Sequence, residues 1–195
     1  MTKMYFAENP DDKHDIHELK VELLGQQMTF LTDAGVFSKK MIDYGSRVLL
    51  SALEFNKKET LLDVGCGYGT LGLTLAKAQE LEVTLVDINQ RALDLARKNA
   101  DVNQVSADIF QSNVYENVTG QFHHIISNPP IRAGKQVVHE VISGSYDHLL
   151  ADGDLTIVIQ KKQGAPSAKT KMEEVFGNCE TLKKDKGYYI LRSVK

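Results

Sequence analysis

Hydrophobic residues in this chain of 195 residues form short apolar runs, and apolar positions at helical spacing follow most of them. The runs that predict strands cover residues 60–63, 83–87, 107–110, 122–126 and 155–159. The patterns that predict helices cover residues 71–76, 89–100, 136–150 (with an interruption at Gly144) and 165–176. Strands that alternate with helices predict an α/β fold with a doubly wound, mostly parallel sheet.

Antiparallel elements are expected at both ends of this pattern. Alternating apolar residues over 19–31, with a turn at Gly25, predict an N-terminal β-hairpin. A helix from Met41 to about Asn56 then leads into the first strand of the sheet. At the other end, residues 180–183 and 188–194 predict a C-terminal hairpin, which adds one antiparallel strand to the sheet.

The chain is expected to form one domain. Residues 1–18 are polar and rich in His and Asp, which predicts a flexible lead-in, and residues 19–195 contain the whole alternating pattern without a repeat. The apolar fraction of 42% and the charged fraction of 25% are typical of globular proteins. Neither an apolar run of about 18 residues nor a signal peptide is present, which predicts a cytoplasmic protein.

Charge and cysteine content narrow the function classes. Cys66 and Cys179 lack the spacing of a metal site, so no metal is expected. The net charge of −3 argues against a globally basic nucleic-acid binder. From residue 160 to the end, however, the chain contains nine Lys and Arg and four Asp and Glu residues. This segment therefore has a net charge of +5, and the remainder has a net charge of −8. This basic segment suits a surface that faces phosphates, and it equally suits a solvated lysine-rich face.

Residues 61–76, LLDVGCGYGTLGLTLA, form the stretch around which the other elements are arranged. A strand that ends at Asp63 is followed by Gly65, Gly67 and Gly69 and then by a helix. Glycines allow sharp turns and a close approach of the backbone to a ligand, and a helix N-terminus offers unpaired N–H groups. The stretch therefore predicts a cofactor cradle.

Two cofactors are candidates for this cradle, and a turn with a purely structural role is the third interpretation of the stretch. Residues 67–72, GYGTLG, spell the dinucleotide fingerprint GxGxxG. In the other register an acidic residue precedes three alternate glycines, which resembles motif I of the class I S-adenosylmethionine-dependent methyltransferases. A carboxylate suits that cofactor, because its methionine part carries an ammonium and a sulfonium. The residues in this register are Asp63, Gly65, Gly67 and Gly69.

Polar residues also follow the next two predicted strands, where ligands of doubly wound sheets bind. Asp87 can accept hydrogen bonds from both hydroxyls of a ribose, a role that nicotinamide enzymes share, or it caps the following helix. Asn113 can bind an adenine edge, or it is a turn residue. With their neighbours Ile88 and Val114, these residues are the candidate contacts of the nucleoside.

The stretch SNPPI at residues 127–131 favours the methyltransferase over the nicotinamide enzyme and over a plain turn. It resembles the (N/D/S)-P-P-(Y/F) motif of methyltransferases that act on planar nitrogens, whose lone pairs are delocalised. If the Asn128 amide oxygen and the Pro129 carbonyl each accept one N–H, the nitrogen can become tetrahedral as the methyl group arrives. Pro130 keeps that carbonyl rigid.

Taken together, the motifs resemble the bacterial small-subunit ribosomal RNA guanine-N2 methyltransferase family, in its short single-domain form. The resemblance begins near residue 20 and extends to the end of the chain. It rests on DAGVFS (33–38), DYGS (43–46), LLDVGCGYGTLG (61–72) and SNPPIRAGK (127–135). It implies a class I methyltransferase sheet with its antiparallel strand, S-adenosylmethionine as cofactor, and guanine N2 in 16S rRNA as the methylated group. Ribosomal RNA or the small ribosomal subunit would be the partner.

Roles follow from the resemblance by position. Asp63, Gly65 and Gly67 would hold the methionine end, Asp87 the ribose, and Asn113 the adenine. Asn128 would lie beside the cofactor and, with Pro129, would hold the target nitrogen.

The chain departs from the family in two features. Full-length members carry an additional N-terminal domain, for which this chain has no room. The residue after the prolines is usually aromatic and stacks on the base, yet here it is Ile131, so Phe37 or Tyr115 is the candidate for the ring. Arg132 and Lys135 are candidate phosphate contacts or ordinary loop charges.

Two other functions remain open. The same planar-nitrogen motif would serve a methyltransferase of a protein glutamine amide. A non-catalytic RNA-binding or ribosome assembly factor could retain the fold, although the intact glycine loop and Asn-Pro-Pro argue against it.

Overall fold

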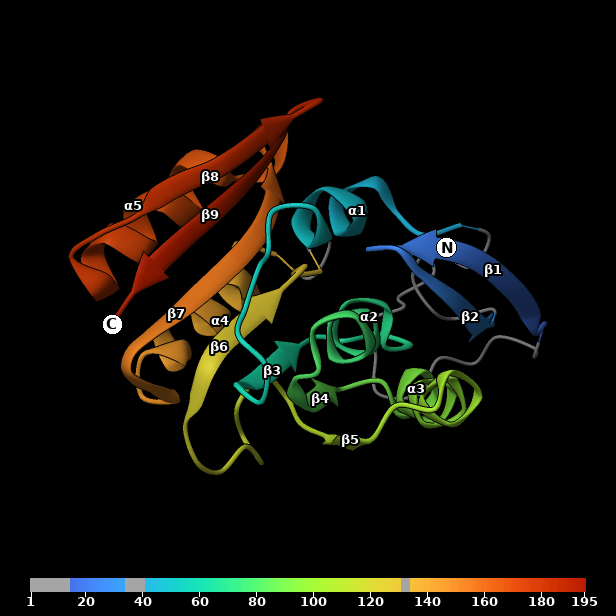
Figure 1. The fold of residues 1–195 in the computed structure, drawn as a ribbon. Helices are drawn as coiled ribbons and strands as arrows, with labels where there is room; N and C mark the ends of the chain where they lie inside the picture. Colours follow the sequence, from blue (N-terminus) through green and yellow to red (C-terminus); the bar gives the residue numbers. More distant parts are fainter. Residues whose placement is uncertain (1–14, 34–40, 131–133) are drawn as a thin grey trace.

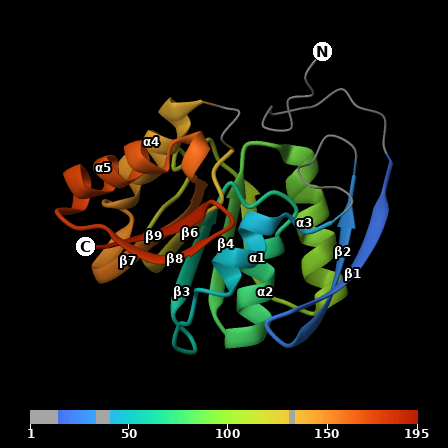
Figure 2. The same ribbon diagram turned by 90° about the horizontal axis from the view of Figure 1, so that it is seen from above.

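The computed structural model describes residues 15–33, 41–130 and 134–195. It contains a two-stranded antiparallel sheet and a seven-stranded sheet with helices on both faces (Figures 1 and 2). The small sheet is the predicted N-terminal hairpin, β1 (His17–Leu23) and β2 (Gln26–Thr32), joined at Leu24 and Gly25. Its first strand begins at His17, inside the segment expected to be a lead-in, and residues 1–14 lie outside the described part.

The large sheet has the order β5-β4-β3-β6-β7-β9-β8. Its strands are β3 (Thr60–Val64), β4 (Glu82–Asp87), β5 (Ala107–Gln111), β6 (Phe122–Ser127), β7 (Leu149–Gln160), β8 (Glu180–Asp185) and β9 (Tyr188–Val194). β9 pairs antiparallel with both β7 and β8, and the pairs among β3 to β7 are parallel. The predicted mostly parallel sheet with an antiparallel C-terminal strand is therefore confirmed.

The helices divide between the two faces of the sheet (Figure 2). They are α1 (Tyr44–Leu50), α2 (Thr70–Gln79), α3 (Gln90–Asn103), α4 (Lys135–Ser145) and α5 (Ala165–Phe176), with a short 3-10 helix, η2 (Lys161–Gln163). On β3, Leu61 packs into the core beneath α1, α2 and α3, and Leu62 packs into the core beneath α4 and α5. Strands buried on both faces are apolar throughout, which is why the sequence pattern identified them.

Two predicted helix boundaries are wrong. α1 covers Tyr44–Leu50 instead of residues 41–56, because Asp43 caps its start by accepting a hydrogen bond from the Ser46 N–H, and Ser51 caps its end. α4 ends at Ser145 instead of Leu150, because Leu149 already pairs with β6 as the first residue of β7.

Gly144, expected to interrupt α4, lies within it. A Cβ at this position would be 2.5 Å from a ring carbon of Tyr115. The glycine therefore makes room for an aromatic ring against the helix, and the helix continues through it.

The N-terminal hairpin is fastened to α3 by side-chain amides. Asn99 accepts a hydrogen bond from the Leu31 N–H at 2.7 Å and donates to the Leu31 and Tyr68 carbonyls at 3.0 and 2.9 Å. Asn103 bonds the Thr29 N–H and carbonyl in the same way. The two amides thus take the place of a neighbouring strand along β2.

We expect Asn99→Ala to lower the free energy of unfolding by about 3 kcal/mol, because it leaves the half-buried Leu31 N–H and carbonyl and the buried Tyr68 carbonyl without this partner. Urea unfolding followed by circular dichroism measures the change. Val102→Ala is the matched control, since Val102 lies on the same helix but is 50% exposed; it should stay within about 0.5 kcal/mol. Equal stability of the two variants would contradict the anchoring role.

Candidate active site

The carboxyl ends of the central parallel strands bring the predicted polar residues to one edge of the sheet. β3 has β4 on one side and β6 on the other. The sheet is therefore built outward from β3 in one direction through β4 and β5, and in the other direction from β6 onward. Open α/β sheets bind ligands at such a point. Asp63, Asp87 and Asn128 all lie at this edge, at or just after the ends of these three strands.

The glycine loop between β3 and α2 has the backbone that the sequence predicts. Gly65, Gly67 and Gly69 have φ angles of +74°, +57° and +93°, which favour glycine. The Gly65 and Cys66 N–H groups both donate to the Val86 carbonyl, at 2.8 and 3.0 Å, and so fasten the loop to β4.

Two of these glycines face open space and the third faces the core. A Cβ on Gly67 would meet no atom within 4 Å, and one on Gly65 would meet only the Pro130 ring, at 4.0 Å. A Cβ on Gly69 would lie 2.7 Å from Leu73. Gly65 and Gly67 therefore line a cradle that side chains would fill, whereas Gly69 serves the start of α2.

Asp63 lies fully buried beneath this loop. Its Oδ2 accepts a hydrogen bond from the Gly72 N–H at 2.9 Å, and its Oδ1 has no hydrogen-bond partner among the described residues. Burial raises the pKa of Asp63 to about 7; the Gly72 N–H opposes this shift, and the charge of Asp87 adds to it. A buried carboxylate oxygen without a partner suits a cationic ligand group.

Asp87 connects the end of β4 to the glycine loop. Its Oδ2 accepts from the Gly67 N–H at 2.8 Å and its Oδ1 from the Asn89 N–H at 2.9 Å. Burial raises the pKa of Asp87, and these backbone N–H groups oppose the shift. The cap of α3 is Asn89, whose side chain accepts from the Ala92 N–H. Each carboxylate oxygen of Asp87 still has a lone pair for a further donor.

The remaining nucleoside candidates follow β4 and β5. Ile88 is half-buried, and its carbonyl accepts a hydrogen bond from the Gln111 side chain at 2.8 Å. Asn113 is exposed in a turn whose next residue, Val114, has a φ of +52°. The Ser112 N–H donates to the Asp87 carbonyl at 3.0 Å, which holds this turn beside the end of β4.

Asn128 follows β6 and is held by residues at the start of α1. Its Nδ2 lies 3.3 and 3.4 Å from the two carboxylate oxygens of Asp43 and 3.1 Å from Ser46 Oγ. Pro129 is buried and Pro130 half-buried. The Asn-Pro-Pro turn therefore lies directly beside the glycine loop, as the contact of Pro130 with the Gly65 position shows. From the sequence, Asp43 and Ser46 belong to the motif DYGS and have no predicted role of their own.

Several predicted substrate residues are separated from this turn or fall outside the described part. Phe37, Ile131 and Arg132 belong to residues outside it. Tyr115 is not available to stack on a base, because its ring packs against Gly144 and its hydroxyl donates to the Val141 carbonyl at 2.8 Å. The prediction of Tyr115 as the stacking ring is therefore wrong.

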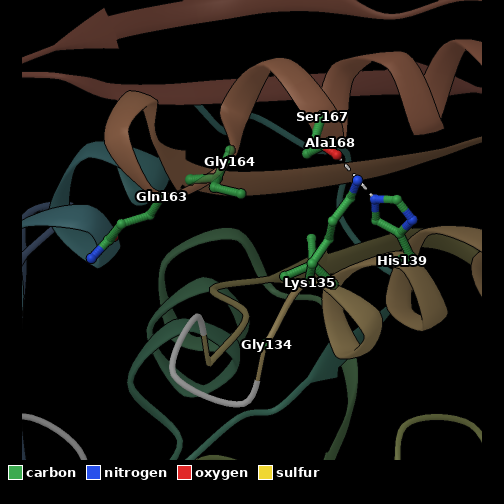
Figure 3. Close-up of a pocket in the computed structure, with 9 residues that line it drawn as sticks. Gly134, Lys135, His139, Gln163, Gly164, Ser167 and Ala168 are labelled. Atoms are coloured by element: carbon green, nitrogen blue, oxygen red, sulfur yellow. Dashed lines mark hydrogen bonds between the residues drawn. The ribbon is translucent and has the colours of Figure 1, made fainter.

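Lys135 begins α4, on the opposite face of the sheet from α1. It lines a hollow of about 110 Å³ between the starts of α4 and α5 (Figure 3). In the same hollow, His139 Nε2 lies 3.2 Å from Ser167 Oγ. Burial, together with the charges of Lys135 and Lys171, lowers the pKa of His139.

Within the described ranges, no group of His, Cys, Asp and Glu side chains has the arrangement of a metal site. The helices of this part of the chain are too short or too polar to cross a membrane.

Comparison with known proteins identifies the family. Residues 27–192 match the family described as methyltransferase small domain. The Bacillus subtilis protein YbxB is 44% identical, with the alignment covering all of both chains. The ribosomal RNA small subunit methyltransferase C of Erwinia tasmaniensis is 37% identical over 87% of this chain. The chain spans about half the length of the relatives with that name.

A solved structure agrees with the sequence comparisons. The T. thermophilus 16S rRNA N2 methyltransferase RsmC, in complex with S-adenosylmethionine and guanosine, superposes with a TM-score of 0.85 at 29% identity. The match covers 92% of this chain and 50% of that one. The predicted class I methyltransferase fold and the predicted family are thereby confirmed.

Proposed function

Because the chain belongs to the methyltransferase small domain family, we propose that it methylates an exocyclic amine of a nucleobase, guanine N2 in 16S rRNA, with S-adenosylmethionine as methyl donor. The observation that carries the proposal is the contact between the Asn-Pro-Pro turn and the glycine loop. Pro130 lies 4.0 Å from the position of a Cβ on Gly65, so a methyl donor in the cradle and an amine at Asn128 would be neighbours.

The residues of the cradle fit this cofactor. The unpartnered Oδ1 of Asp63 would take the ammonium of the methionine part, next to the open backbone at Gly65 and Gly67. The free lone pairs of Asp87 would accept the ribose hydroxyls, with Ile88 beside them. Asn113 and Val114 would border the adenine. When bound, S-adenosylmethionine supplies the methyl group, and its sulfur keeps the electron pair of the broken bond.

The Asn-Pro-Pro turn would prepare the amine. The amide oxygen of Asn128 and the carbonyl of Pro129 would each accept one N–H, which turns the nitrogen lone pair toward the methyl carbon. Pro130 fixes the Pro129 carbonyl. One of the two amine protons leaves to water after the new N–C bond has formed, so no protein base is required.

A basic rim beside the turn supports RNA as the substrate. The η2 residues Lys161 and Lys162 are exposed, and the Lys161 N–H donates to the Gly187 carbonyl in the β8–β9 turn. In that turn Lys186 lies 4.8 Å from the ring of Tyr44, which follows Asp43. These lysines, and Lys135, would contact phosphates around the target base. The partner would be ribosomal RNA or the small ribosomal subunit in the cytoplasm.

The test combines cofactor binding with product analysis. We expect calorimetry to detect binding of S-adenosylmethionine and its demethylated product but not of NAD. Incubation with 16S rRNA or small subunits that lack the modification should then yield N2-methylguanosine, identified by mass spectrometry of nucleosides. Binding without methylation of either substrate would instead favour the assembly factor, and methylation of a protein glutamine would favour the other enzyme.

Salt dependence adds a second criterion. RNA affinity should fall steeply with salt, and the slope of log affinity against log salt should decrease by about one for each contacting lysine replaced by glutamine. Lys161→Gln and Lys186→Gln test the rim, and Lys57→Gln is the control, because Lys57 is exposed and precedes β3 at the opposite edge of the sheet.

A further inference from the structure

We propose that Asp43 and Ser46 are positioning residues that fix the amide of Asn128 with its oxygen turned toward the target amine. This inference rests on the proposed function, because it explains how Asn128 presents an acceptor rather than a donor to the base. An asparagine amide has a donor end and an acceptor end of nearly equal size. Only one of its two orientations can serve an N–H donor.

The geometry joins three side chains from two distant parts of the sequence. Asp43 Oδ1 accepts a hydrogen bond from the Ser46 N–H at 3.1 Å, and the Ser46 hydroxyl donates to Asp43 Oδ2. Asn128 Nδ2 then meets both residues, 85 and 82 positions away along the chain. Ser46 is 4% exposed, so water competes little for its hydroxyl, and Asp43 and Asn128 are half-buried.

Both neighbours of Asn128 Nδ2 present only lone pairs. The Asp43 carboxylate is an acceptor, and the hydrogen of the Ser46 hydroxyl is already donated to that carboxylate. If the amide were rotated by 180°, its oxygen would face these lone pairs and both hydrogen bonds would be lost. The oxygen of Asn128 is therefore directed to the other side, away from α1.

The same contacts increase the strength of the acceptor. An amide whose N–H₂ group donates to a carboxylate is polarised, and its oxygen becomes a better acceptor for a further hydrogen bond. That oxygen is the atom proposed to receive the amine N–H as the nitrogen becomes tetrahedral.

The support for Asn128 is itself held in place. A Cβ on Gly45 would lie 2.9 Å from the Tyr188 ring and 3.1 Å from Asp43 Oδ1. Only glycine at this position lets Tyr188 of β9 pack against the turn that carries Asp43 and Ser46. The amide of Asn128 is thus supported by a turn packed against the sheet.

The alternative is that Asp43 has only a structural role, as the N-cap of α1. Asp43→Asn separates the two roles, because asparagine caps helices as well as aspartate does but can offer either a donor or an acceptor to Asn128. We expect this variant to keep its melting temperature and its affinity for S-adenosylmethionine. Its turnover number on RNA should fall by about tenfold, as expected for the loss of one charge-assisted hydrogen bond. Unchanged turnover would overturn the inference.

An exchange of side chains gives a sharper test. Asn128→Asp places two carboxylates against each other and should be less active than Asp43→Asn. The double variant Asp43→Asn/Asn128→Asp restores one amide facing one carboxylate. We expect it to exceed Asn128→Asp in turnover by about tenfold, the scale of coupling between residues in direct contact. Additive losses in the double variant would show that the two side chains act independently.

NMR of the free protein tests the positioning of Asn128 without measuring turnover, and so independently of the proposed function. In NMR spectra of the free protein, the side-chain amide protons of Asn128 should shift downfield and show a coupling across the hydrogen bond to the Asp43 carboxyl carbon. The downfield shift should decrease and the coupling should weaken in Asp43→Asn, because the amide that replaces the carboxylate is a weaker acceptor and can face Asn128 with its own N–H₂ group. If both signals are absent in the unsubstituted protein, the positioning fails, whatever the substrate. If they are present but no RNA is methylated, the proposed function fails instead.

Discussion

We expect Asn128→Ala to lower the turnover number for RNA methylation by about 10²-fold or more, the scale observed for the loss of one preorganised polar group. The hydrogen bond to the Asn128 oxygen should strengthen as the amine nitrogen becomes tetrahedral. Its loss should therefore affect turnover more than substrate binding. Affinity for S-adenosylmethionine should change little, because the Asn128 side chain is bonded to Asp43 and Ser46 and not to the glycine loop.

Single-turnover kinetics with saturating RNA, together with calorimetry of the cofactor, separates these effects. Asn56→Ala is the matched control, because Asn56 is exposed and precedes β3 at the opposite edge of the sheet. It should keep normal turnover. If Asn128→Ala were also nearly normal, the Asn-Pro-Pro turn would be structural and its catalytic assignment would fail.

The sequence predicted the strands better than the helix ends. Strands β3 and β4 are buried on both faces, so each is a short apolar run. The glycine loop and α2 separate the two runs in the sequence, which makes each of them easy to recognise. The predicted end of α1 lies beyond the observed one, because Ala52 and Leu53 continue the helical spacing past the Ser51 cap. The predicted start of β7 lies after the observed one. Of the first four residues of this strand only Leu149 is buried, so the apolar run is not visible there, and the pairing of Leu149 with Phe122 is a long-range contact.

The candidate site was predictable where a residue follows a strand directly. The ends of parallel strands meet at one edge, so the positions of Asp63, Asp87 and Asn128 follow from their place in the sequence alone. The support from Asp43 did not follow, because a contact over 85 residues depends on where α1 packs. For the same reason the sequence could not reveal that Tyr115 is enclosed against Gly144 of α4.

We expect the affinity for S-adenosylmethionine to rise with pH between about 5.5 and 7, by up to tenfold per unit, because Asp63 must lose a proton to bind the ammonium. Burial raises the pKa of Asp63 from 3.8 to about 7, so the free protein holds this proton below neutral pH. The contribution of Asp63 to folding stability depends on pH in the opposite direction. Since the folded state binds the proton more tightly, the stability that this group contributes is present at low pH and declines as the pH rises from about 4 to 7.

Asp63→Asn tests this assignment, because the amide oxygen can still accept the Gly72 N–H while the charge is removed. We expect the affinity to fall by about 10- to 100-fold, the range for a charge-assisted hydrogen bond, and its pH dependence to become much weaker. Any dependence that remains would come from Asp87, whose pKa is also raised. Asp108→Asn is the control, since Asp108 is exposed on β5 and should change neither property. Calorimetry in two buffers of different ionisation enthalpy measures the released proton directly. If the unsubstituted protein released none at pH 6, and Asp63→Asn bound the cofactor equally well, then Asp63 would not hold the ammonium and its burial would serve the loop alone.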